Sequence, residues 1–201
     1  MTGLLYKEFY MIKAQIKIWL VIFVVIGLYN MTLKSGFILH MLTPMVGIMT
    51  CLSSFSYDKM FRCEEYIAAM PVSRKKIVLS KYAFFLLLSL GTTLLTLLAL
   101  LILGYSMGET AAVAFGTLGA TIALQMIMIP LIYKWGPEKA RILFLVICFS
   151  PYFMITFFKD KFLNISDQLL PDILKVTPII LFILFAVSFF ISVHIYEKKD
   201  F

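Results

Sequence analysis

The sequence predicts an all-α protein that crosses a membrane several times. Of its 201 residues, 62% are hydrophobic and only 14% are charged, a balance typical of chains embedded in a membrane. The apolar stretches are about 20 residues long, which is the length an α-helix needs to cross a hydrocarbon core of about 30 Å. We therefore expect one polytopic domain built from transmembrane helices.

Six stretches that lack Asp, Glu, Lys and Arg have roughly this length and are the predicted spans. They cover residues 18–33, 36–55, 82–104, 110–133, 142–158 and 176–196. Before the first span, apolar residues recur at helical spacing from Leu5 to Ile16, so residues 1–17 are predicted to form an interfacial helix on the membrane surface. Residues 159–175 are predicted to form a short helical segment in the loop before the last span.

The positions of the basic residues predict the orientation, because Lys and Arg near the ends of spans are retained on the cytoplasmic side. With the N-terminus inside, 14 of the 18 Lys and Arg residues fall on cytoplasmic segments. Both termini are therefore predicted to be cytoplasmic. The net charge of +7 follows from this topology and gives no argument for binding nucleic acid.

Residues 56–81, between the second and third spans, form the longest charged segment and hold six of the basic residues. Helical spacing predicts a short amphipathic helix from about Asp58 to Met70. Its apolar face would carry Met60, Cys63, Ile67 and Met70, and its polar face Asp58, Arg62 and Glu65. Pro71 would end this helix.

Ser73 is the predicted N-cap of a second helix that continues into the third span. Three basic residues, Arg74 to Lys76, follow it in the first turn. Cations at that position oppose the helix dipole. Lipid phosphates, the cytoplasmic charge bias or an acidic partner must therefore account for them.

The sequence lacks the motifs of several other functional classes. It contains no G-x-x-x-x-G-K-[ST] phosphate loop and no Cys/His pair at metal-ligand spacing, so we expect no catalytic residue, metal or cofactor in this chain. The predicted spans also carry no Asp, Glu, Lys or Arg, which predicts that no buried charge couples transport to an ion. Energy for uphill transport would then come from another polypeptide.

The fourth predicted span carries a stripe of small residues, Ala112, Gly116 and Ala120, spaced four apart. Such stripes let a neighbouring helix approach closely. We assign this one to packing within the subunit.

The charged segment resembles that of the type-2 permeases of ATP-binding-cassette (ABC) transporters. The resemblance rests on Tyr57-Asp58, Tyr66, the run from Met70 to Val78, and Lys81-Tyr82 before the third span. It implies a fold of six transmembrane helices with an N-terminal interfacial helix and a cytoplasmic coupling helix between spans two and three. It also implies that this coupling helix docks on a soluble ATPase subunit, and that this subunit binds the ATP. The permease itself would lie in the plasma membrane of a bacterium.

The resemblance implies a docking site as well. Carried over by position, the site comprises Asp58, Arg62, Glu64, Glu65, Tyr66, Met70, Pro71, Ser73 and Arg74. Within it, Pro71 to Arg74 would set the angle between the coupling helix and the third span.

The function expected is that of a permease subunit of an ATP-driven exporter, which moves an amphipathic peptide, drug or lipid-like substrate out of the cytoplasm. The working unit would hold two copies of this chain, or one copy with a related permease, over two ATPases. The alternative is a structural or assembly membrane protein whose loop docks a partner that is not an ATPase. A membrane enzyme acting on lipids is disfavoured, because the spans offer only dispersed reactive groups.

Overall fold

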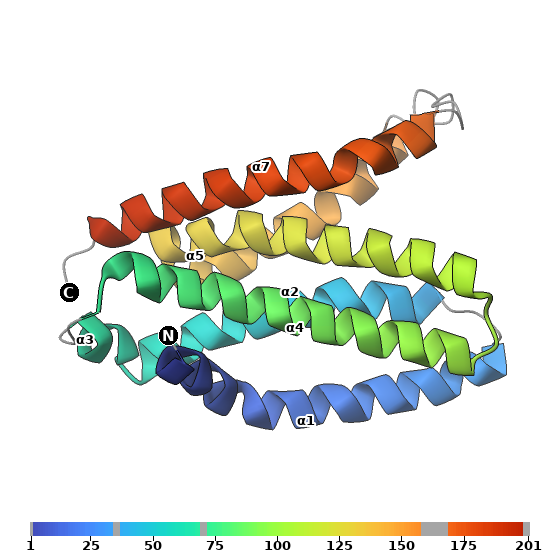
Figure 1. Ribbon diagram of the computed structural model, residues 1–201, viewed down its shortest axis with the longest axis horizontal. Coiled ribbons are helices and arrows are strands. Elements are labelled where there is room, and N and C mark those ends of the chain that lie inside the picture. Colours follow the sequence, from blue (N-terminus) through green and yellow to red (C-terminus); the bar gives the residue numbers. More distant parts are fainter. Residues whose placement is uncertain (1, 34–36, 69–71, 158–168, 199–201) are drawn as a thin grey trace.

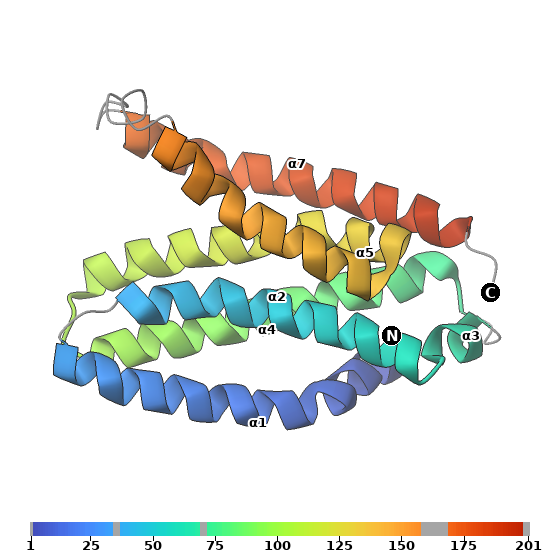
Figure 2. The same cartoon turned by 180° about the vertical axis from the view of Figure 1, so that it is seen from behind.

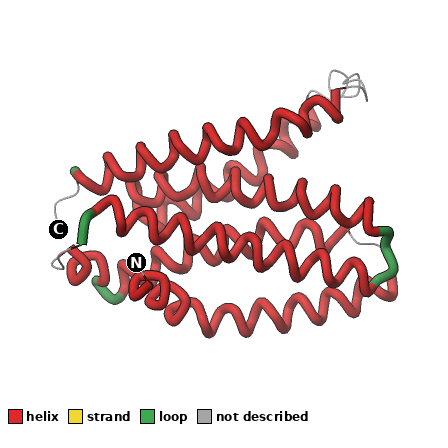
Figure 3. Tube along the Cα trace, viewed as in Figure 1, coloured by secondary structure: helices red, strands yellow, loops and turns green. Residues whose placement is uncertain are grey.

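The protein is described here by a computed structural model that covers residues 2–33, 37–68, 72–157 and 169–198. Within those ranges every regular element is an α-helix, as Figure 3 shows. The helices are α1 (Thr2–Leu33), α2 (Phe37–Met60), α3 (Cys63–Ala68), α4 (Arg74–Ile102), α5 (Met107–Phe157) and α7 (Leu169–Glu197). The all-α class is confirmed for the described residues.

The long helices lie side by side along one common direction (Figures 1 and 2). One of them, α5, folds back on itself at Gly136, whose backbone has φ 81° and ψ 165°. Residues with a side chain rarely adopt this conformation, so glycine is required at the turn. The predicted spans 110–133 and 142–158 fall on the two limbs of α5, one before the turn and one after it.

By length and composition alone, four helical stretches in the described ranges could cross a membrane. They are Gly3–Asn30, Arg74–Ile102, Val113–Val146 and Pro178–Glu197, and the third of them includes the turn at Gly136. The predicted span 36–55 is not among them. It falls on α2, which carries many Thr and Ser residues and packs against α1, α4 and α5. The number of six crossings and their orientation stay predictions.

Two predicted boundaries differ from the observed helices. The interfacial helix over 1–17 and the first span over 18–33 are one continuous helix, α1, which bends near its N-terminal end (Figure 1). Ile12 of this helix is completely buried in the main core. The predicted segment 159–175 lies mostly outside the described residues, and its last part, from Leu169, already belongs to α7.

Polar side chains connect the helices inside the bundle. The Tyr82 hydroxyl lies 2.6 Å from the Ser188 hydroxyl and 2.8 Å from that of Ser192, and Ser188 donates to the Met126 carbonyl at 2.5 Å. These bonds join α4, α7 and α5. Where lipid surrounds a protein, such contacts between helices replace part of the hydrophobic driving force that water would supply.

Two helices approach closely at Gly47 and not at the predicted small-residue stripe. A Cβ atom at Gly47 would lie 2.6 Å from Cγ2 of Thr121, so α2 and α5 can touch there only because the side chain is missing. In the stripe, Gly116 and Ala120 are exposed, and a Cβ atom on Gly116 would meet nothing within 4 Å. The expectation that the stripe packs inside the subunit is therefore wrong for these two residues.

Candidate functional site at the α3 end of the bundle

The sequence elements singled out for docking gather at one end of the bundle. Figures 1 and 2 show that α3, the N-terminus, the start of α4 and the C-terminal end of α7 lie at this end. We call it the α3 end. It contains the charged residues that the structure brings into contact with one another.

The predicted amphipathic helix from Asp58 to Met70 is in fact two helices. The first, α2, ends at Met60, and α3 begins at Cys63. Between them Arg62 has φ 50°, a left-handed conformation that costs a residue with a Cβ atom about 1–2 kcal/mol. The prediction of one continuous helix is wrong, because it counted helical faces across this break.

The break changes which residues point outward. In α3, Tyr66 is 70% exposed and Glu65 is exposed, while Ile67 is buried in the core. The connecting turn exposes Phe61 and Arg62. Of the predicted docking residues, Arg62, Glu65 and Tyr66 therefore share an accessible surface, to which Phe61 adds an apolar ring.

The remaining predicted docking residues around α3 have separate outcomes. The side chain of Glu64, and all of Met70 and Pro71, lie outside the described residues.

Cys63, which was predicted on the apolar face, is half-buried on the inner side of α3. Burial and then the nearby Asp58 carboxylate raise the pKa of its thiol, which favours the neutral thiol over the reactive thiolate.

Asp58 lies inside the protein, although its sequence pattern assigned it to the polar outer face. It is 1% exposed. One carboxylate oxygen accepts a hydrogen bond from Nζ of Lys7 at 2.6 Å, and the other contacts Nζ of Lys81. A carboxylate enclosed in this way is not available to a partner protein, so we leave Asp58 out of the docking surface.

Glu8 completes this group of charges, in which Lys7 is partly exposed and the other three are buried. Its carboxylate lies 3.0 Å from Nζ of Lys81 and 3.0 Å from Nζ of Lys7, and it accepts a hydrogen bond from the Ser54 hydroxyl at 2.5 Å. We call Lys7, Glu8, Asp58 and Lys81 the ion cluster. It contains two positive and two negative groups, whose charges compensate one another. Lys81 is 4% exposed and Glu8 is 2% exposed, so this compensation takes place inside the protein.

The ion cluster links three helices at the point where α3 is attached. Lys7 and Glu8 come from α1, Asp58 is two residues from the end of α2, and Lys81 lies in the second turn of α4. Lys81 also sits 4.3 Å from the centre of the Phe55 ring, a cation–π contact. These bonds therefore hold α1, α2 and α4 together next to α3.

Sequence reasoning missed the ion cluster. We predicted no buried charge, because Lys81 lies one residue outside the predicted third span and was counted among the cytoplasmic lysines. A signal was present in the sequence: Glu8 is the one acidic residue before Asp58. An isolated acid in such an apolar stretch calls for a basic partner from elsewhere in the chain.

Ser73 and Arg74 have structural roles at the start of α4. Ser73 is the N-cap as predicted, with extended backbone, but its side chain makes no capping hydrogen bond. The Arg74 guanidinium donates to the backbone carbonyls of Tyr196 and Glu197, at 3.1 and 2.7 Å. These are terminal carbonyls of α7, where a cation also complements the helix dipole.

A second salt bridge at this end is exposed. Nζ of Lys59 lies 3.0 Å from the Glu138 carboxylate, with 63% and 82% of the two side chains accessible. It connects the end of α2 with the limb of α5 that follows Gly136. Because both groups are in water, the bridge contributes little stability.

Comparison with known proteins gives one match that covers nearly the whole chain. Residues 3–197 match the model of a family described as "ABC-2 family transporter protein". No curated protein and no solved structure matches the chain.

Proposed function

Because this chain belongs to the ABC-2 family of transporter membrane proteins, we propose that it is the permease subunit of an ATP-driven exporter. The family assignment implies a partner ATPase, and the chain itself has no phosphate loop. The observation that carries the proposal is the exposed surface of Phe61, Arg62, Glu65 and Tyr66 at the α3 end. It combines two aromatic rings with charges of both signs, a composition suited to protein contacts.

The proposed mechanism assigns different tasks to the surface and to the ion cluster. The soluble ATPase binds ATP and contacts the exposed residues of α3 and its preceding turn. Its movement displaces α3, and Asp58 passes this displacement to Lys81 of α4 and Lys7 of α1. The cluster thus makes the membrane helices respond as one unit, because each carboxylate contacts both lysines and the loss of any one charged side chain would leave an opposite charge without full compensation.

The substrate proposed is an amphipathic peptide, drug or lipid-like molecule that leaves the cytoplasm. Two copies of the chain, or one copy with a related permease, would form the pore in a bacterial plasma membrane, with both termini on the cytoplasmic side. Small bacterial permeases such as the membrane subunit of the phenol-soluble-modulin exporter are the proposed model for this arrangement. Nucleic acid has no place in this function.

A direct test is co-purification of the full chain with candidate ABC ATPase subunits from the same genome, followed by measurement of ATP hydrolysis. Tyr66→Ala and Glu65→Lys should each weaken the complex by about tenfold or more, because exposed aromatic and charged residues are typical anchors of an interface. Tyr29→Ala is the matched control, since Tyr29 is also exposed but lies near the other end of α1.

Two outcomes would contradict the proposal. If both α3 variants bind the ATPase and stimulate its turnover like the unaltered chain, docking takes place elsewhere. If no ATPase co-purifies and α3 captures a different membrane or assembly protein, the alternative of a structural role is favoured.

A further inference from the structure

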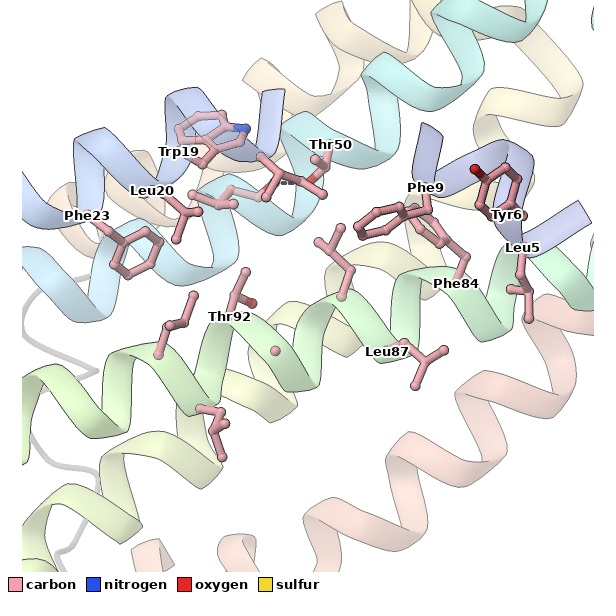
Figure 4. A pocket seen from close by; sticks show the side chains of 16 residues that line it. Leu5, Tyr6, Phe9, Trp19, Leu20, Phe23, Thr50, Phe84, Leu87 and Thr92 are labelled. Atoms are coloured by element: carbon pink, nitrogen blue, oxygen red, sulfur yellow. Dashed lines mark hydrogen bonds between the residues drawn. The ribbon is translucent and has the colours of Figure 1, made fainter. Parts of the chain in front are cut away.

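A large apolar groove lies between α1 and α4, with part of α2 at its base. Its volume is about 730 Å³, within the range of roughly 300–1,000 Å³ typical of small-molecule sites. Figure 4 shows Phe9 and Phe23 of α1 on one wall and Phe84 and Leu87 of α4 on the other. Nearly all of its lining is hydrocarbon, and Thr50 and Thr92 supply two of its few polar atoms.

The two walls of the groove are both candidate membrane spans. Exposed apolar side chains are frequent on both wall helices, among them Val21 and Val24 on α1 and Leu90 and Leu98 on α4. Water does not fill apolar space of this kind, and an empty groove would lose dispersion contacts along both walls. We therefore expect hydrocarbon chains of the surrounding membrane to occupy the groove.

The α1 wall of the groove carries unpaired positive charge between Phe9 and Ile16. Lys13 lies four residues after Phe9 and three before Ile16, both of which line the groove, so it occupies the same face of α1. Lys13 and Lys17 are exposed, and neither has an acidic partner among the described residues. The nearest acid on α1, Glu8, is already held within the ion cluster.

Two exposed tyrosines near the start of α1 indicate where the surface of the membrane meets this helix. Tyr6, which lines the end of the groove, and Tyr10 are both largely exposed. Exposed tyrosines are enriched where lipid headgroups begin. Lys13 comes one turn after Tyr10, within reach of a phosphate at that depth.

We propose that the groove binds an acyl chain of an anionic phospholipid from the leaflet at the α3 end, with Lys13 and Lys17 contacting its phosphate. A second copy of this chain fits less well. A two-fold contact through this face would place the same unpaired lysines of both copies together, with no acid to separate them. The proposal does not depend on the ATPase partnership.

The test blocks the groove without disturbing the helices. Gly91 of α4 lines the groove, and a Cβ atom there would meet nothing within 4 Å. Gly91→Phe therefore places a ring in the open space, and phenylalanine has a higher helix propensity than glycine. Gly116→Phe is the matched control, because Gly116 is equally open but lies on α5, away from the groove.

The measurement is native mass spectrometry of the full chain in detergent, titrated with phosphatidylglycerol or with phosphatidylcholine. Gly91→Phe should weaken phosphatidylglycerol binding by more than about tenfold, because exclusion of only two CH₂ groups has about this effect. Lys13→Gln should weaken it by about fivefold and leave phosphatidylcholine binding unchanged. Gly116→Phe and Lys139→Gln, which removes an exposed charge on α5, should bind both lipids like the unaltered chain.

Three results would overturn the inference. Unchanged phosphatidylglycerol binding by Gly91→Phe would show that the lipid is not in the groove. If the unaltered chain and Lys13→Gln both bind the two lipids equally well, Lys13 does not select the anionic lipid. A dimer of the unaltered chain that Gly91→Phe dissociates would mean that a second copy fills the groove.

Discussion

The two salt bridges that start from the end of α2 use the same chemistry in opposite surroundings. Asp58 and Lys81 form a bridge whose side chains are 1% and 5% exposed, whereas Lys59 and Glu138 form one at 63% and 82%. The buried bridge is supported by Glu8, Lys7 and the Phe55 ring. No such support surrounds the exposed one among the described residues.

The comparison teaches that burial decides what each bridge can do. Removing a charge from water is costly, so a buried pair persists only when several partners compensate it, and its loss is severe. An exposed pair can exchange its partner for water or for another protein at small cost. Lys59 is thus accessible to a partner protein, while Asp58 is committed to holding helices together.

The largest effect is expected from Lys81→Met. The substitution keeps a long apolar stem but leaves Glu8 and Asp58 to share Lys7 alone, so one negative charge stays buried without compensation. The chain should lose about 3–5 kcal/mol of folding stability, measured by unfolding in detergent micelles. If stability is unchanged, the cluster does not hold α1, α2 and α4 together.

A double variant sharpens this result. Lys81→Met combined with Asp58→Asn removes one charge of each sign, and the remaining pair, Lys7 and Glu8, stays 3.0 Å apart. We expect the double variant to be more stable than Lys81→Met alone, because replacing both partners of a buried pair is often nearly neutral. A double variant that is as unstable as the sum of the single changes would mean that the charges do not interact.

An intermediate effect is expected from Ser54→Ala. The Ser54 hydroxyl donates to Glu8 at 2.5 Å and accepts a hydrogen bond from Lys81 at 3.2 Å. Its loss should cost about 1–3 kcal/mol, since a charged acceptor then loses a donor inside the protein. Ser56→Ala is the control, because Ser56 donates to a carbonyl of its own helix, that of Leu52, and should change stability less.

The smallest effect is expected from Lys59→Met. Both partners of its bridge are in water, so the loss should be about 1 kcal/mol or less, and it should shrink further as salt is added. The same variant should still weaken ATPase binding if Lys59 belongs to the docking surface. A stability loss as large as that of Lys81→Met would contradict the distinction between the two bridges.

Local patterns in the sequence predicted part of the α3 end correctly. The exposed position of Glu65 and the N-cap at Ser73 follow from spacing and residue type, which act within a few residues. Tyr66 was singled out by the family resemblance, and Arg62 is exposed in a turn and not on the predicted helix. The break at Arg62 was not predicted, because no glycine or proline marks it and a left-handed arginine is uncommon. Asp58 was misplaced for the same reason, since its face was inferred from a helix that does not continue.

By itself, the sequence determined the all-α membrane class, the family and the charged segment between the second and third predicted spans. These depend on composition, on the lengths of apolar stretches and on short motifs, all of which are local. Only the tertiary structure decided that residues 7, 8, 58 and 81 meet in one buried cluster, and that α1 and α4 separate enough to leave a groove. Charges far apart in a chain compensate one another only where packing brings them together, and a groove exists only where neighbouring side chains fail to fill the space between two helices.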